Sequence, residues 1–233
     1  ITGVESRACV NAAVSAGARK VYLIEEPVAA ALGAGLDLSV PRGRFILDMG
    51  GGTTDIAVLS LNGIVCKKSI KLAGRKLDEA IVRCVRTDRN VLIGEKMAER
   101  IKIEVGSVFY TEDKEMEAKG RNLHTGLPEK FVIRTSDIYD ALMEQVMQIV
   151  TAVQQILEIT PPELSADIWE DGLIMTGGGA LLHGLGDLIS QHAKIKVRLA
   201  EHPVECVAIG TALSFSKLDE LYDGFVTPST HTH

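Results

Sequence analysis

Aromatic residues, paired cysteines and long apolar runs are all scarce in this chain of 233 residues. Phe, Trp and Tyr make up 4% of it, so we expect a mainly aliphatic core. The sequence has no Cys-x-x-Cys pair, which argues against a zinc site or a disulfide framework and favours reduced thiols in a cytosolic protein. The cysteines are Cys9, Cys66, Cys84 and Cys206. No apolar run approaches the length of a membrane span, and no signal peptide is visible.

An excess of positive charge is also missing. The chain has 25 Lys and Arg against 31 Asp and Glu, a net charge of −6, which argues against a nucleic-acid partner. Its hydrophobic fraction of 46% and charged fraction of 24% are those of a soluble globular protein with one large domain or two small ones. The sequence opens on Ile1, not Met, within a helical pattern, so we expect an N-terminally truncated form of a longer protein.

The most informative stretch, residues 45–59, is a glycine run between two apolar strands. Asp48 stands near the end of the first strand, residues 50–52 are all Gly, and Thr53 and Thr54 precede the second strand. Glycines let backbone N–H groups approach a ligand and form a concave anion site. A carboxylate beside phosphate oxygens is a natural place for Mg²⁺, usually through water. The pattern predicts a phosphate-binding hairpin, unlike a Walker A or Rossmann turn because no helix follows the glycines. An ordinary tight hairpin is the alternative.

Two further motifs carry candidate chemistry. A second glycine run, residues 177–179, follows a strand predicted over residues 172–175, and a helix is expected over residues 180–192. Backbone N–H groups at such a helix start suit phosphate or ribose oxygens. Glu26 belongs to a Glu-Glu-Pro step that opens a helix over residues 28–36, where the helix N-terminus favours an ionised carboxylate. By itself, Glu26 is better explained as a charge that only stabilises the helix.

Periodicity predicts the remaining elements. Helices are expected over residues 5–16, 77–85, 94–105, 138–158 and 204–213, and strands over residues 21–24, 64–70, 115–118, 130–133 and 197–199. Asn62-Gly63 is a type I′ turn signal, and Pro161-Pro162 are expected to end the long helix. The charged residues of the helix over 94–105 are by default a solvated face. Residues 227–233 are expected to be disordered.

Together these segments resemble the actin and heat-shock-chaperone ATPase superfamily, and most closely its bacterial actins, the MreB family. The matching segments cover residues 24–31, 48–55, 98–104 and 176–182, and Leu72-Ala73-Gly74-Arg75 is similar to a segment of eukaryotic actin. The resemblance, over residues 1–213, implies an α/β, actin-like ATPase fold of two ribonuclease-H-like lobes around a nucleotide cleft, with the first lobe incomplete. It places residues 1–40 and 210–233 in the first lobe, 41–76 and 141–209 in the core of the second lobe, and 77–140 in the outer subdomain of the second lobe.

The resemblance also implies roles for individual residues. Glu26 would position or activate the attacking water, assisted by Thr53, and Asp48 matches the acid near Mg²⁺. The implied nucleotide-binding residues are Gly50, Gly51, Gly52, Thr53, Glu99, Arg100, Ile101, Lys102, Gly177, Gly178, Gly179, Ala180 and Leu181.

The function implied by the resemblance is an ATP-hydrolysing, filament-forming bacterial actin that maintains rod shape by guiding cell-wall synthesis. ATP and Mg²⁺ would be its cofactors. Its partners would be further copies of itself, the cell-wall elongation machinery and, through an N-terminal region missing here, the inner membrane. Filaments would be cytoplasmic and membrane-associated.

Part of the family pattern is not found in this sequence. The family's first phosphate loop has no counterpart here, so this chain alone is expected to be inactive as an ATPase. A chaperone-like ATPase is the alternative, but neither a peptide-binding β-domain nor a chaperone interdomain linker is visible. A sugar-kinase relative would need a catalytic Asp and a sugar pocket, and neither is identified.

Overall fold

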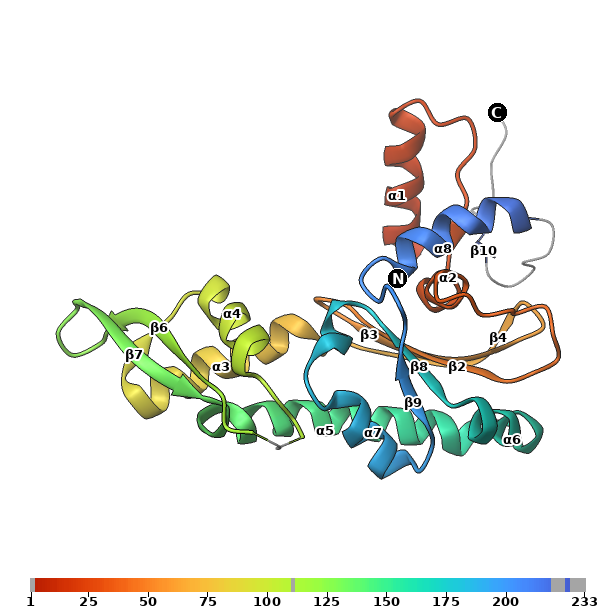
Figure 1. Ribbon diagram of the computed structural model, residues 1–233. Helices are drawn as coiled ribbons and strands as arrows, with labels where there is room; N and C mark the ends of the chain where they lie inside the picture. The colour runs from red at the N-terminus through yellow and green to blue at the C-terminus, as the bar shows by residue number, and fades with distance from the viewer. Residues whose placement is uncertain (1–2, 110–111, 219–224, 227–233) are drawn as a thin grey trace.

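The computed structural model describes residues 3–109, 112–218 and 225–226. A five-stranded sheet with helices on both faces adjoins a smaller outer part made of a three-stranded sheet and two helices (Figure 1). The larger sheet has the order β4-β3-β2-β8-β9. Its strands are β2 (Arg44–Met49), β3 (Thr54–Ser60), β4 (Gly63–Ile70), β8 (Leu173–Thr176) and β9 (Val197–Leu199). The predicted three-stranded meander is confirmed, and β8 pairs with β2 in parallel.

Side-chain alternation explains why both faces of this sheet are covered. Phe45, Leu47 and Met49 belong to a large core with α5 (Thr135–Ile159) and α7 (Leu185–Ala193). Ile46 of the same strand instead belongs to a smaller core with α2 (Glu26–Gly33). Figure 1 shows α2 and α8 (Cys206–Ser214) on the opposite side of the sheet from α5 and α7. Because β2 is the middle strand, it is apolar on both faces except at Arg44, at its start, and at Asp48.

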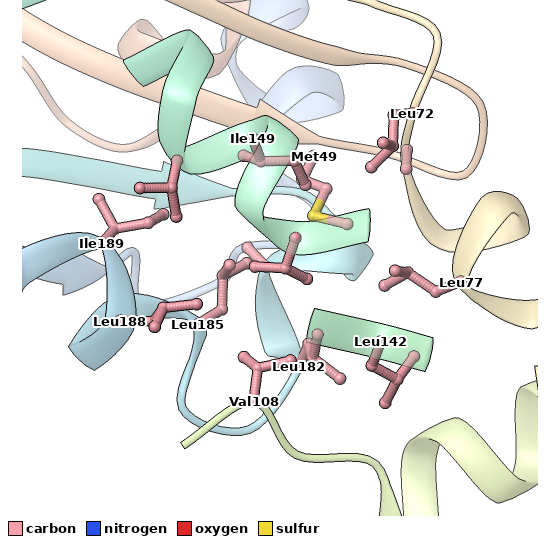
Figure 2. Packing of buried hydrophobic residues seen from close by; sticks show 14 of the residues in the cluster. Met49, Leu72, Leu77, Val108, Leu142, Ile149, Leu182, Leu185, Leu188 and Ile189 are labelled. Carbon is pink, nitrogen blue, oxygen red and sulfur yellow. The ribbon is translucent and has the colours of Figure 1, made fainter. Parts of the chain in front are cut away.

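The outer part consists of α3 (Gly74–Arg89), α4 (Glu95–Val105), β5 (Val91–Leu92), β6 (Glu115–Asn122) and β7 (Pro128–Arg134). The long helix α5 runs along both parts (Figure 1). The apolar stripe that the sequence predicts for this helix is buried at Ile138, Leu142, Val146, Ile149, Val153 and Ile156, and its last member, Leu157, is half-buried. Figure 2 shows Met49, Leu77, Leu142 and Leu182 among the side chains of one core cluster. The two parts therefore share a continuous core.

The remaining elements lie on both sides of the larger sheet or at its end (Figure 1). Helix α1 (Gly3–Ser15) contributes no buried residue. Strand β1 (Leu23–Ile24) is shorter than the predicted strand and pairs with β10 (Phe225–Val226). Helix α6 (Pro162–Asp171) leads into β8. Within the described residues, no helix has the length and apolarity needed to cross a membrane.

Two local predictions are wrong. The hairpin turn is Leu61-Asn62, not Asn62-Gly63, because the irregular register at Val58/Leu59 pairs Ser60 with Gly63; Leu61 and Asn62 have φ of 48° and 61°. The prediction that Pro161-Pro162 end the long helix is confirmed, because α5 ends at Ile159. Pro162 also begins α6, a helix that was not predicted, since proline is well suited to a first helical turn.

The second glycine run was also expected to lead directly into an α-helix. It instead forms a short 3₁₀ turn, Gly178–Leu181. Helix α7 begins only at Leu185 because Gly184 adopts a left-handed φ of 79°. Residues 227–233 lie outside the described residues. The division into two lobes stays a prediction.

Candidate functional site

Two carboxylates face each other at the end of the central hairpin. Asp48 is the direct cross-strand partner of Asp55. By strand alternation both lie on the face that α2 covers. Asp48 is only 3% exposed, and the Thr176 hydroxyl donates to its Oδ1 at 2.6 Å. Burial raises the pKa of Asp48, the hydrogen bond from Thr176 opposes that rise, and the charge of Asp55 adds to it.

A third carboxylate, Glu26, lies at the start of α2. Partial desolvation raises its pKa, and the charges of Asp55 and Asp48 raise it further. The sequence argument considered only the helix N-terminus, which favours the charged form; the two nearby carboxylates oppose that effect. Glu25, its neighbour, points elsewhere and pairs with Lys67 at 2.8 Å. We call Glu26, Asp48 and Asp55 the acidic cluster, because their charges act on one another; within the described residues no three such side chains are placed to hold a metal ion by themselves.

The first glycine turn is anchored through its carbonyl groups. Gly50 O accepts from the N–H of Gly74 at 3.2 Å, and Gly51 O accepts from the N–H of Arg75 at 2.9 Å. Thr53, half-buried, closes the turn by accepting from the N–H of Gly50 at 3.0 Å. Among the described hydrogen bonds, the N–H groups of Gly51 and Gly52 have no protein acceptor. The absence of a protein acceptor is compatible with the anion site that the glycine pattern predicts, and that site stays a prediction.

The parallel pairing of β2 with β8 sets the second glycine turn beside the first. A Cβ on Gly177, whose φ is 84°, would lie 2.3 Å from the carbonyl oxygen of Met49. A Cβ on Gly179 would lie 2.5 Å from Met49 Cγ. Both positions thus require glycine because Met49 packs directly against the turn. Ligand sites in open α/β sheets commonly lie at the carboxyl ends of strands, as here.

Between the two turns, α3 and α4 lies a cleft of about 490 Å³. Seven of the predicted residues line it: Gly50, Gly51, Glu99, Lys102, Gly178, Gly179 and Leu181. Six residues that were not predicted also line it: Gly74, Arg75, Asp78, Ile103, Leu182 and His183. A somewhat larger hollow of about 540 Å³ between β4, α3 and α5 contains no predicted site residue. The smaller cleft is therefore the candidate functional site.

The other predicted residues lie outside the lining of this cleft. Ile101 is fully buried in the core, and Arg100 points to solvent, where it pairs with Glu104 at 2.6 Å. Helical spacing explains the difference, because Glu99, Lys102 and Ile103 share one face of α4 while residues 100 and 101 do not. The residues without a place in the lining are Gly52, Thr53, Gly177, Ala180, Arg100, Ile101, Glu26 and Asp48.

An ion pair forms the side of the cleft nearest α3. Lys102 Nζ lies 2.8 Å from Asp78 Oδ1 and donates to Gly74 O at 3.1 Å. The two side chains are 14% and 13% exposed. Burial raises the pKa of Asp78, contact with Lys102 opposes this, and Glu99 and Glu95 add to it. Spacing along the sequence does not reveal Asp78 as a site residue, because its partner Lys102 lies on a different helix.

Lys102→Met is expected to destabilise the fold by about 3 kcal/mol at neutral pH, because it leaves a mostly buried carboxylate without its cation. The pKa of Asp78 then rises further above its usual value. The loss should shrink as the pH falls through that raised pKa and Asp78 takes up a proton. Urea unfolding at neutral and mildly acidic pH measures both effects. Arg100→Met, on the exposed side of α4, is the control and should cost under about 0.5 kcal/mol; equal losses in the two variants would contradict the assignment.

Comparisons with known proteins match nearly the whole chain. The family model for the MreB/Mbl protein matches residues 1–223. The chain belongs to the MreB/Mbl family. It is 47% identical over 222 residues to the cell shape-determining protein Mbl of Bacillus subtilis, covering 95% of this chain and 67% of the relative. It is 48% identical over 219 residues to the cell shape-determining protein MreB of Escherichia coli, covering 94% and 63%. The chain thus spans about two thirds of the length of these MreB/Mbl relatives.

Solved structures confirm the predicted actin-like fold. MreB5 of Spiroplasma citri bound to AMPPNP superposes with a TM-score of 0.90 at 36% identity, covering 94% of this chain and 66% of that one. The same protein bound to ADP gives the same score. A MamK double helical filament gives a TM-score of 0.75 at 19% identity, which supports the fold alone. The family recognised from the glycine and glutamate motifs is therefore correct.

Proposed function

We propose that this MreB/Mbl chain binds ATP in the cleft between its two glycine turns and, in the full-length protein, assembles into filaments. The observation that carries the proposal is the convergence of both turns and the Lys102 face of α4 on one cleft of about 490 Å³. That volume is within the usual range for small-molecule sites, about 300–1,000 Å³. MreB5 of Spiroplasma citri, solved with AMPPNP and with ADP, shares this fold. Filaments in the cytoplasm at the inner membrane, guiding cell-wall synthesis to maintain rod shape, are the cellular role that we propose.

The acidic cluster suits a magnesium ion brought in with the nucleotide. Burial and Asp55 both hinder ionisation of Asp48, so a nearby cation would stabilise its charged form. Mg²⁺ commonly uses one or two carboxylates, with water and substrate phosphates as the other ligands. Asp48, supported by Asp55, is the residue that would hold it, and the ion would supply charge stabilisation of the phosphates.

Hydrolysis would require a group that orients the attacking water. Glu26 fits this role because its pKa is raised toward neutrality, which improves a general base. Thr53, in the adjacent turn, is the proposed assistant. The free N–H groups of Gly51 and Gly52 would stabilise charge on the phosphate oxygens.

Glu26→Gln in the full-length protein is expected to leave nucleotide affinity nearly unchanged and to slow ATP hydrolysis about 100-fold, the usual scale for a positioned general base. Phosphate release and a nucleotide titration measure the two quantities. Glu25→Gln is the matched control, since Glu25 is adjacent in sequence but pairs with Lys67. If the Glu26 variant hydrolyses ATP at the wild-type rate, Glu26 is not the general base and only stabilises the helix through its charge.

Sedimentation of the full-length protein tests filament formation. We expect protein in the pellet with ATP and Mg²⁺, and much less in it when nucleotide is absent. A protein that binds ATP but stays in the supernatant under all conditions would contradict the filament proposal while leaving the nucleotide site standing.

A further inference from the structure

The hollow of about 540 Å³ between β4, α3 and α5 concentrates positive charge on a protein that is acidic as a whole. Its cationic residues are Lys68, Lys71, Lys76 and Arg83, and none of the described residues that line it is an acid. A concave site lined by charge of one sign attracts counter-ions more strongly than a flat surface does. We call this hollow the basic groove. It shares no lining residue with the nucleotide cleft.

Most of the charge in the basic groove has no counter-charge among the described residues. Lys68 donates to a neutral amide oxygen on α5. Lys71 forms no ion pair with any residue that the structure describes. Lys76 and Arg83 share one carboxylate, Glu79, at 2.7 and 4.0 Å. Glu79 is 49% exposed, so water screens this pairing. The described ion pairs thus supply one carboxylate for four cations.

Helix α5 lines the groove with neutral donors. Gln145, Gln148 and Gln155 are three and seven residues apart, so they share one face of the helix over about 15 Å. Each side-chain amide has two N–H donors that can bind an anion. Leu72 and Ala152, both buried, add apolar surface to the lining, and such low-dielectric walls strengthen the attraction between charges. The groove therefore combines cations from β4 and α3 with amide donors from α5.

We infer that the basic groove binds a compact phosphate polyanion of the oligophosphate class, at a site separate from the nucleotide cleft. Its volume is within the usual range for small-molecule sites, about 300–1,000 Å³. A phosphate group concentrates nearly two charges on three oxygens, whereas a carboxylate carries one. Four cations around so small a space match closely spaced phosphates better than the separated carboxylates of a peptide. None of the described lining residues is aromatic, so the groove offers no ring on which a base could stack.

Calorimetric titration of the full-length protein with tripolyphosphate tests the inference. We expect binding that weakens steeply as salt is added, because salt screens exposed charges. Acetylated triglutamate, a peptide with four carboxylates, should bind roughly tenfold more weakly, the effect of one charge-assisted contact. Equal binding of the two compounds would assign the groove to acidic peptides and overturn the phosphate inference. A protein that does not bind tripolyphosphate even at low salt would overturn it as well.

Substitution of Lys71 locates the site. Lys71→Gln removes a charge without breaking an ion pair, and should lower the affinity for tripolyphosphate by roughly fivefold to tenfold. Lys71→Glu should lower it further. Affinity for ADP in Mg²⁺ should stay at the wild-type value in both variants, because Lys71 lies outside the lining of the nucleotide cleft. Lys119→Gln, at an exposed position of β6, is the matched control and should change neither affinity.

The outcomes of this test separate the groove from the nucleotide cleft. Equal tripolyphosphate affinities in Lys71→Gln and Lys119→Gln would overturn the inference and leave the proposed nucleotide site standing. A parallel loss of ADP affinity in the Lys71 variants would mean that tripolyphosphate occupies the nucleotide cleft, which would also overturn the inference. Failure of the wild-type protein to bind ADP would contradict the proposed function and not the oligophosphate site.

Discussion

Asp48→Asn is expected to weaken binding of the magnesium–nucleotide complex by about 10- to 100-fold, the usual effect of losing a group that supports a bound metal. Asparagine keeps an oxygen that can accept the Thr176 hydrogen bond but carries no charge for the cation. Titration of ADP in the presence of Mg²⁺ and in the presence of a chelator separates metal-dependent from metal-independent binding. Only the affinity measured with Mg²⁺ should fall. Asp187→Asn, an exposed acid in the first turn of α7, is the control. An Asp48 variant with undiminished affinity in Mg²⁺ would remove this residue from the metal site.

The same substitution should not destabilise the fold at neutral pH. The pKa of Asp48 is raised in the folded protein, so the folded state binds its proton more tightly than the unfolded chain does. The contribution of Asp48 to the stability of the wild-type protein is therefore greatest below the ordinary carboxyl pKa. It declines as the pH rises through the raised pKa of Asp48 in the folded protein. Asparagine does not titrate, so the variant should lack this decline. Thermal unfolding of both proteins across the acidic to neutral range measures the difference.

Gly210→Ala is expected to destabilise the protein by about 3 kcal/mol, at the upper end of ordinary overpacking costs. Helices α2 and α8 cross with their backbones in contact. A Cβ on Gly210 would lie 1.7 Å from Ala29 O, and a Cβ on Gly33 would lie 1.8 Å from Cys206 O. Backbone atoms cannot rotate away as a side chain can, so the helices must separate. Because α2 carries Glu26 at its start, hydrolysis should also decrease.

A lower urea midpoint with an unchanged slope would show that the Gly210 substitution alters stability and not the extent of unfolding. Gly186→Ala is the matched control within α7. There the nearest atom to a new Cβ is the flexible methyl end of Met175, at 3.2 Å. Similar midpoints for the two variants would contradict the tight crossing.

Local patterns predicted most of the elements because their signals are local. The glycine-flanked strands, the stripe of α5 and the strand before Gly177 all follow from spacing along one segment. The turn at Leu61-Asn62 was misplaced because register along the meander determines it, and Leu61 is a poor residue for positive φ. The α6 helix was missed because Pro162 was taken only as a stop.

Only about half of the residues that line the cleft could be predicted, because only those belong to local sequence motifs. Motif residues such as Gly50, Lys102 and Gly178 line the cleft, and helical spacing would have excluded Ile101 at once. Asp78 and His183 depend on contacts between distant segments, with Lys102 and Ser107 respectively. Arg75 was noticed within Leu72-Ala73-Gly74-Arg75, but no role was assigned to it. The roles of Glu26, Thr53 and Asp48 in catalysis and metal binding stay predictions.

The pairing of β2 with β8 also bears on the rate of folding. It joins residues such as Asp48 and Thr176, which are 128 positions apart, whereas the β2-β3-β4 meander needs only short turns. Long-range parallel contacts require the closure of a large loop and form slowly. The cleft exists only once that closure has occurred, since its two glycine turns belong to the two strands. A nucleotide bound there would act on the completed fold, so its stabilising effect would fall on the rate of unfolding and not on the early steps of folding.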